Sequence, residues 1–78
     1  MENFKELSNR IKQRREQLNY TQKDLAELTN ISERTIRAIE NGEGSTSILS
    51  WFKILETLGL EMKFTFKVLN DEARNSLL

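Results

Sequence analysis

Apolar side chains recur along the chain with two different periods, and the change of period divides it into a helical part and a strand. In residues 3–18 the apolar positions are spaced by three, four and seven, which predicts an amphipathic helix. They are Phe4, Leu7, Ile11 and Leu18. In residues 61–69, EMKFTFKVL, apolar and polar side chains alternate, which predicts a β-strand.

Between these segments, the stretch YTQKDLAELTNISERTIRAIENG, which begins at Tyr20, has the pattern of two short helices joined by a tight turn. Thr21 is a good N-cap, and Asp24 three residues later makes a near capping box that opens the first of these helices. Asn30 stands where the chain must reverse, and Asn tolerates the left-handed conformation better than other residues with a side chain. Ser32 is expected to cap the second helix, which an Asn-Gly pair ends.

A further helix is predicted from a cap at Ser47 to about Leu58, with Gly59 as its stop. Its apolar surface is wider than one stripe, so we expect it to be buried on more than one side. One side would pack on the N-terminal helices and another on a partner, and we assign Trp51 to that partner interface. The loop before this helix contains Ser45, whose N–H and hydroxyl can bind phosphate, although a neighbouring Glu opposes an anion there.

The strand in residues 61–69 has no partner within the sequence, because no other segment alternates in this way. A lone strand leaves its backbone groups unpaired, and even a two-stranded ribbon needs something to cover its apolar face. We therefore predict that it pairs with the same strand of a second molecule; the alternative is addition to the sheet of a different partner. The residues assigned to the dimer interface are Trp51, Met62, Phe64, Phe66 and Val68. Residues 70–78 are expected to be a polar, mobile tail, in which Leu77 and Leu78 are candidates for a partner contact.

The outer side of the second short helix carries the candidate DNA-reading groups. Ile36 and Ile39 form its buried stripe, which leaves Glu33, Arg34 and Arg37 on the opposite face. An Arg side chain binds the O6/N7 edge of guanine through two hydrogen bonds, and a helix-turn-helix presents the N-terminal part of its second helix to the major groove. Both Arg residues can equally hold phosphates, and Glu33 can accept from cytosine N4 or simply favour the helix N-terminus. The alternative is a solvated charged face on an ordinary helical hairpin.

The composition narrows the classes of function. A chain of 78 residues makes one domain, so small that oligomerisation is a common way to bury more surface. Without Cys or His it has no disulfide framework, no soft metal ligands and no usual general base, so we expect no cofactor and no enzymatic activity. No stretch is apolar enough to span a membrane, and the N-terminus lacks a signal-peptide pattern, so we expect a cytoplasmic protein.

The charge balance bears on how DNA would be bound. Twelve basic and twelve acidic residues cancel, whereas many DNA-binding domains are basic overall. The neutral balance predicts weak non-specific affinity and binding that needs a correct sequence and a dimer. It also supports an alternative, a protein-interaction module that has kept this helical motif without using DNA.

The stretch TQKDLAEL, a turn and then SERTIRAIENG resembles the helix-turn-helix of the Xre/Cro/C1-type transcriptional regulators, and the resemblance extends from about Leu7 to Leu60. The matching residues are Thr21, Gln22, Ala26, Ser32, Ile36, Glu40, Asn41 and Gly42. The LGL sequence at 58–60, followed by an alternating strand, is similar to the HipB-like antitoxin branch. Two departures are Asn30, where relatives usually have Gly, and Gly44-Ser45-Thr46, where they tend to carry Pro.

This resemblance implies a mostly α, lambda-repressor-like domain of four to five helices over residues 1–60, with a single C-terminal strand that pairs across a homodimer. It also implies an ion pair between Arg15 and Glu40, which ends the reading helix, and it implies that Gln22 braces that helix and reaches a phosphate or base edge. Thr35 can offer its methyl group to thymine. The residues assigned to DNA contacts are Thr21, Gln22, Ser32, Glu33, Arg34, Thr35, Arg37 and Ser45.

The implied function is that of a sequence-specific repressor acting as a homodimer on a palindromic operator in double-stranded DNA. The HipB-like features further imply an antitoxin that represses its own operon and binds a HipA-like kinase toxin. The alternatives are a stand-alone Xre-type regulator without a toxin partner and the interaction module described above.

Overall fold

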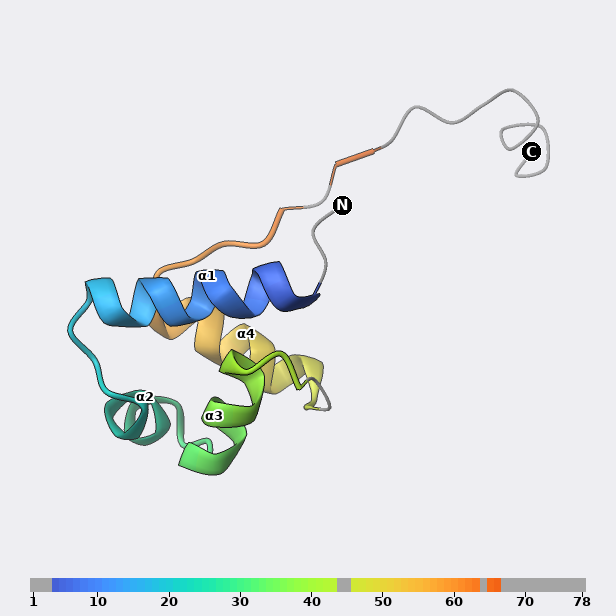
Figure 1. The fold of residues 1–78 in the computed structure, drawn as a ribbon. Helices are drawn as coiled ribbons and strands as arrows, with labels where there is room; N and C mark the ends of the chain where they lie inside the picture. Colours follow the sequence, from blue (N-terminus) through green and yellow to red (C-terminus); the bar gives the residue numbers. More distant parts are fainter. Residues whose placement is uncertain (1–3, 44–45, 64, 67–78) are drawn as a thin grey trace, which may run out of the picture.

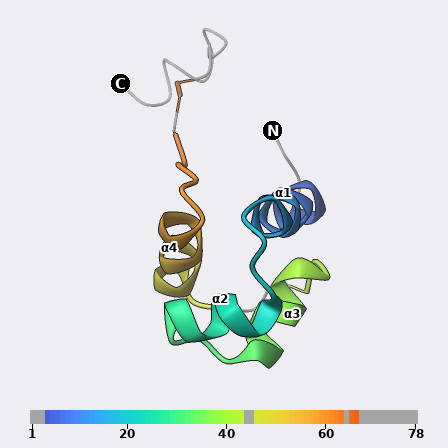
Figure 2. The same cartoon turned by 90° about the vertical axis from the view of Figure 1, so that its left-hand side faces the viewer.

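The computed structural model describes residues 4–43, 46–63 and 65–66. These residues form four helices joined by short turns, and α2 and α3 lie together at one end of the molecule (Figures 1 and 2). The helices are α1 (Phe4–Gln17), α2 (Gln22–Thr29), α3 (Glu33–Glu40) and α4 (Ile48–Thr57). The helical part of the predicted mostly α architecture, a helix-turn-helix domain of four to five helices, is thus confirmed, with four helices in the described part of the chain.

Hydroxyl side chains begin three of the four helices. The side chains of Thr21, Ser32 and Ser47 each accept a hydrogen bond from the backbone N–H three residues later. Each therefore satisfies one of the N–H groups that the first turn of a helix leaves without a partner. These are the three caps that the sequence predicts.

All four helices end at a residue in the left-handed conformation. The φ angles are 61° at Asn19, 58° at Asn30, 81° at Gly42 and 67° at Gly59. After α3, the N–H of Gly42 donates to the carbonyl of Ile39, and the next N–H donates to the carbonyl of Ala38. This pair of bonds is a Schellman motif, which satisfies the last carbonyls and turns the chain sharply.

The core is formed by side chains from every helix. The buried apolar residues are Ile11, Leu25, Ile36, Ile39, Trp51, Ile54, Leu55 and Leu58. Three of them come from α4 and a fourth, Leu58, is the residue that caps its end. Helix α4 packs against α2, while α3 packs against both α1 and α2. Because α3 is held from two sides, its outward face has a defined orientation.

Trp51 lies in a different place from the one expected. Its side chain is buried in the core of the protomer, where its ring meets Phe4 of α1 edge to face at a centroid distance of 5.2 Å. The assignment of Trp51 to an intermolecular interface is therefore corrected, because the indole packs inside the protomer, where it contacts Phe4 of α1. The apolar surface that α4 leaves exposed is formed instead by Ile48, Leu49 and Phe52, of which Leu49 is 71% exposed.

The segment after α4 runs away from the end of the molecule that carries α2 and α3 (Figures 1 and 2). No strand occurs within residues 4–43, 46–63 and 65–66. The strand over 61–69 and its intermolecular pairing therefore stay predictions. Met62 and Phe66 are exposed, whereas Phe64, Val68 and the tail at 70–78 lie outside the described residues.

Candidate nucleic-acid interface

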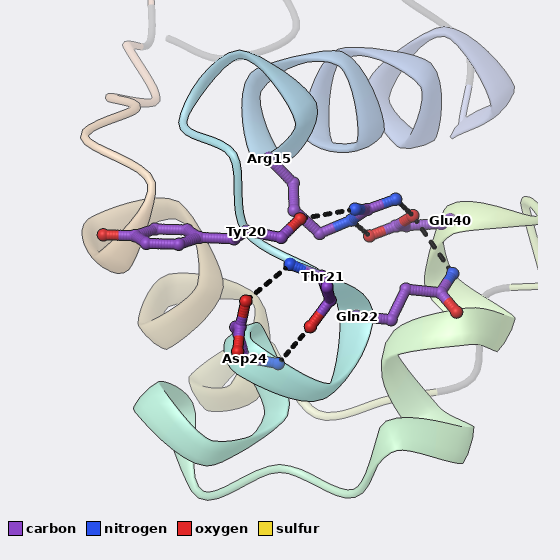
Figure 3. A network of polar contacts seen from close by, with 6 residues as sticks. All are labelled: Arg15, Tyr20, Thr21, Gln22, Asp24 and Glu40. Carbon is purple, nitrogen blue, oxygen red and sulfur yellow. Dashed lines mark hydrogen bonds and ion pairs between the residues drawn. The ribbon is translucent and has the colours of Figure 1, made fainter.

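The first helix of the motif is opened by a complete capping box. The backbone N–H of Asp24 donates to the Thr21 hydroxyl oxygen at 2.9 Å, and the N–H of Thr21 donates to the Asp24 carboxylate at 2.8 Å (Figure 3). Hydrogen bonding to the backbone N–H of Thr21, and then to its side chain, lowers the pKa of the Asp24 carboxyl. Thr21 therefore holds the start of α2, and its hydroxyl oxygen is already engaged as an acceptor.

The turn and the second helix follow directly. Asn30 adopts the left-handed conformation that reverses the chain, and Ser32 then caps α3 by accepting from the N–H of Thr35 at 3.1 Å. The Ser32 hydroxyl in turn donates to the Thr35 hydroxyl oxygen at 2.8 Å. The two hydroxyl side chains thus fix each other at the N-terminus of α3, the part that a helix-turn-helix presents to the groove.

The two sides of α3 differ sharply in exposure. Ile36 and Ile39 are buried, whereas Glu33, Arg34 and Arg37 are exposed. The Arg37 Nη2 lies 3.4 Å from the Glu33 Oε1, one turn earlier on the same face. The face assigned to DNA reading is therefore solvent-accessible and carries two guanidinium groups, one of which is paired with a carboxylate.

The end of α3 is anchored by a buried polar network (Figure 3). The Arg15 Nε and Nη2 donate to the two carboxylate oxygens of Glu40 at 2.7 and 3.0 Å, a bidentate fork. The Arg15 Nη1 donates to the backbone carbonyl of Tyr20 at 2.7 Å, and the Gln22 Nε2 donates to the Glu40 Oε1 at 3.3 Å. One cluster therefore joins α1, the α1–α2 turn, the start of α2 and the end of α3.

The ion pair at the centre of this network is almost entirely removed from solvent. The side chains of Arg15 and Glu40 are 11% and 1% exposed. Hydrogen bonding to Glu40 raises the pKa of the Arg15 guanidinium above its usual range, against an opposing effect of burial. Both groups are satisfied by several hydrogen bonds, which is the condition under which charges can be buried.

The positions assigned from the sequence do not form one cluster. Gln22 belongs to the buried network through its amide nitrogen, while Glu33, Arg34 and Arg37 lie on the open face of α3. Ser45 lies outside the described residues. Within the described ranges no group of His, Cys, Asp or Glu is arranged to hold a metal ion, and none of the helices there is long and apolar enough to cross a membrane.

One contact, between α1 and the end of α4, was not predicted. The Arg14 Nε donates to the backbone carbonyl of Leu58 at 2.9 Å, which ties α1 to the last turn of α4. A signal for it exists in the sequence, because Arg14 lies one turn after the buried Ile11 and helix C-termini have free carbonyls. The sequence does not show which of those carbonyls the side chain reaches.

Comparison with known proteins agrees with this geometry. A family model described as helix-turn-helix matches residues 11–64. The chain is 40% identical over 57 residues to the antitoxin HipB of Escherichia coli O6:H1 and 39% identical to that of strain K12, covering 73% of this chain. It spans 61% and 65% of the length of these two relatives. It is also 36% identical to an uncharacterized HTH-type transcriptional regulator of Methanocaldococcus jannaschii, with 85% of this chain and 100% of the relative covered.

Superposition on solved structures leads to the same family. One chain of a HipA–HipB–O2–O3 complex superposes with a TM-score of 0.76 at 32% identity, covering 87% of this chain and 96% of that one. A chain of a HipB–O1–O2 complex superposes with a TM-score of 0.75 at 33% identity, covering 85% and 96%. The motif geometry, the sequence identity and the superposition agree: this chain belongs to the Xre/C1-type helix-turn-helix family of DNA-binding transcriptional regulators, and HipB antitoxins are among its homologues.

Proposed function

We propose that this protein is a sequence-specific transcriptional repressor that binds a palindromic operator as a homodimer. The observation that carries the proposal is the anchoring of α3: the Arg15–Glu40 fork holds its C-terminal end while Arg34 and Arg37 face solvent. A reading helix whose orientation is set before binding loses less freedom on entering the groove. This preorganisation favours discrimination among base sequences over general attraction to DNA.

The start of α2 supplies a second contact, with the phosphate backbone. Its capping box uses the N–H groups of Thr21 and Asp24, so the N–H groups of Gln22 and Lys23 are the ones directed at a phosphate. The carboxylate of Asp24 weakens the attraction for an anion here. We therefore assign this end a positioning role, with Gln22 linking the phosphate to Glu40 through its amide.

The segment after α4 is the part of the chain that we propose forms the homodimer contact. The chain leaves α4 through residues 60–63, on the side away from α2 and α3 (Figures 1 and 2). An intermolecular strand pair formed by the alternating segment that begins there would keep both reading helices free. Two reading helices related by a two-fold axis fit half-sites about 34–36 Å apart, or a multiple of that distance. Met62, Phe64, Phe66 and Val68 form the apolar face of the proposed strand pair.

The antitoxin role extends the repressor proposal. The relatives include HipB antitoxins and a HipA–HipB–O2–O3 complex. We propose that this chain likewise binds a HipA-like kinase toxin and represses the operon that encodes both. A pull-down with the product of the neighbouring gene tests this part, and the absence of a complex would favour a stand-alone regulator.

The repressor proposal is tested by fluorescence anisotropy with DNA from upstream of its own gene and a scrambled duplex. We expect selective binding of two protomers per site, and a loss of about 1–3 kcal/mol in binding free energy for Arg34→Ala or Arg37→Ala if each reads a base. Lys53→Ala is the matched control, because Lys53 is exposed on α4. Equal binding of both duplexes would favour the interaction module, and intact operator binding by both Arg variants would refute the assigned reading face.

A further inference from the structure

We propose that Glu33 makes this protein discriminate against non-specific DNA by holding the guanidinium of Arg37. The inference rests on the proposed function and deepens it, since it names the residue that keeps the reading face from binding duplexes regardless of their sequence. It starts from the 3.4 Å contact between the Arg37 Nη2 and the Glu33 Oε1. The two side chains are 55% and 45% exposed, so the pair forms in solvent and can open when DNA arrives.

The two acidic residues of α3 have different environments. Glu40 is buried and bonded to Arg15 and Gln22, so its charge is compensated inside the domain. Glu33 is exposed at the first turn of the helix, on the same face as Arg37. Its carboxylate is therefore the acidic group that α3 brings to a DNA duplex.

A duplex of random sequence offers the Arg37 guanidinium only phosphate oxygens. These are anionic acceptors like the Glu33 carboxylate, so they give Arg37 little reason to leave its present partner. To reach a phosphate, Arg37 must leave Glu33, whose charge then stands unpaired beside a polyanion. A correct site offers the guanidinium a base edge with two acceptors, and this bidentate contact compensates for the opened pair. Glu33 thus lowers affinity for wrong sequences more than for the right one, which is discrimination by a repulsive group.

Because the chain has no net charge, a single carboxylate such as that of Glu33 has a large effect on non-specific binding. With twelve basic and twelve acidic residues there is no overall positive field, so non-specific affinity depends on the charges next to the duplex. Arg34 has no ion pair among the described residues, whereas Arg37 has one with Glu33. The reading helix therefore presents one guanidinium that is ready for DNA and one that must first be released.

The test compares Glu33→Gln with wild type in anisotropy titrations against promoter DNA and a scrambled duplex at several salt concentrations. At about 50 mM salt we expect the affinity for scrambled DNA to rise about three- to tenfold, the amount that one additional phosphate contact supplies, with the salt slope steeper by about 0.9. The affinity for promoter DNA should rise less, so the preference for the promoter falls. Glu27→Gln is the control, because Glu27 lines the same hollow between α2 and α3 as Glu33.

An Arg37→Met background shows whether Glu33 acts through Arg37. If it does, Glu33→Gln raises the affinity for scrambled DNA less in that background than in the wild type, because it relieves only the repulsion by the carboxylate and frees no guanidinium; a double-mutant cycle measures this difference. An effect of the same size in both backgrounds, or an equal effect of Glu27→Gln, would show general charge repulsion and overturn the inference. Selective loss of promoter binding would overturn it too, because Glu33 would then itself read a base. Failure of the proposed function looks different: wild-type protein would bind both duplexes equally.

Discussion

At the residue scale, the Arg15–Glu40 fork is the feature on which the domain most depends. Its charges are removed from water, so removal of one leaves the other buried without a partner. The pair spans 25 residues of sequence and joins α1 to α3, which also meet in the apolar core. Its loss therefore affects both stability and the orientation of α3.

Arg15→Met is expected to lower the free energy of unfolding by about 3–5 kcal/mol, because the Glu40 carboxylate then lies buried without its counter-charge. A domain of this length has about 4–12 kcal/mol in total, so Arg15→Lys is the milder companion that keeps the charge. Urea denaturation followed by circular dichroism measures both. Lys12→Met, on the exposed side of α1, is the control. Equal stability of Arg15→Met and Lys12→Met would contradict the structural role.

A second prediction concerns Ser8, whose buried hydroxyl has no hydrogen-bond partner among the described residues. Ser8→Ala removes an unsatisfied polar group and raises helix propensity, so we expect a gain of about 1–2 kcal/mol. Asn9→Ala, at the exposed neighbouring position, measures the propensity effect alone. If thermal unfolding shows no larger gain for Ser8→Ala than for Asn9→Ala, the Ser8 hydroxyl has a partner in solution.

At the scale of the elements, helix boundaries follow from chemistry within three or four residues. Thr21, Ser32 and Ser47 cap the helices they were expected to cap, and Asn30 adopts the left-handed conformation expected at the turn. These outcomes were predictable because a cap requires only its own helix. The cap at the start of α2 can be tested by pH, because it includes the titratable carboxyl of Asp24.

Stability contributed by the capping box should be lost at acid pH. The pKa of the Asp24 carboxyl is lowered in the folded protein, so the folded state favours the ionised form. The contribution is present above the unfolded pKa of about 3.9 and disappears as the pH falls through the lower folded value. Thermal unfolding from about pH 6 down to about pH 2 should show a shallower decline for Asp24→Asn than for wild type. Parallel curves would mean that Asp24 makes no ionised cap.

At the scale of the whole molecule, the reading surface and the chain that leaves α4 lie on opposite sides of the helical domain (Figure 2). Arg14 strengthens this arrangement by donating to the Leu58 carbonyl where α4 ends. The exposed apolar residues of α4 and of the segment after it lie outside the core, and a second molecule is the proposed cover for them.

Phe66→Lys tests that cover, because the proposed strand pair would bury the ring and a charge there would be desolvated. We expect this variant to sediment as a monomer in analytical ultracentrifugation at concentrations where wild type is a dimer. Thr65→Lys introduces the same charge on the opposite side of the alternating pattern and should stay dimeric. A dimer unaffected by Phe66→Lys would move the interface to another surface, with Ile48, Leu49 and Phe52 as the next candidates.

The sequence by itself determined the four helices, their caps, the reversal at Asn30 and the outward face of α3, because local hydrogen bonds and helical periodicity depend on near neighbours. The resemblance to Xre-type regulators added the pairing of Arg15 with Glu40 and the bracing of the reading helix by Gln22. Only the tertiary structure decided that the Tyr20 carbonyl joins that network, that Trp51 belongs to the protomer core, and that Arg14 holds the end of α4. These contacts join residues far apart in the chain, and their geometry is set by how the helices pack, which no spacing within a single helix encodes.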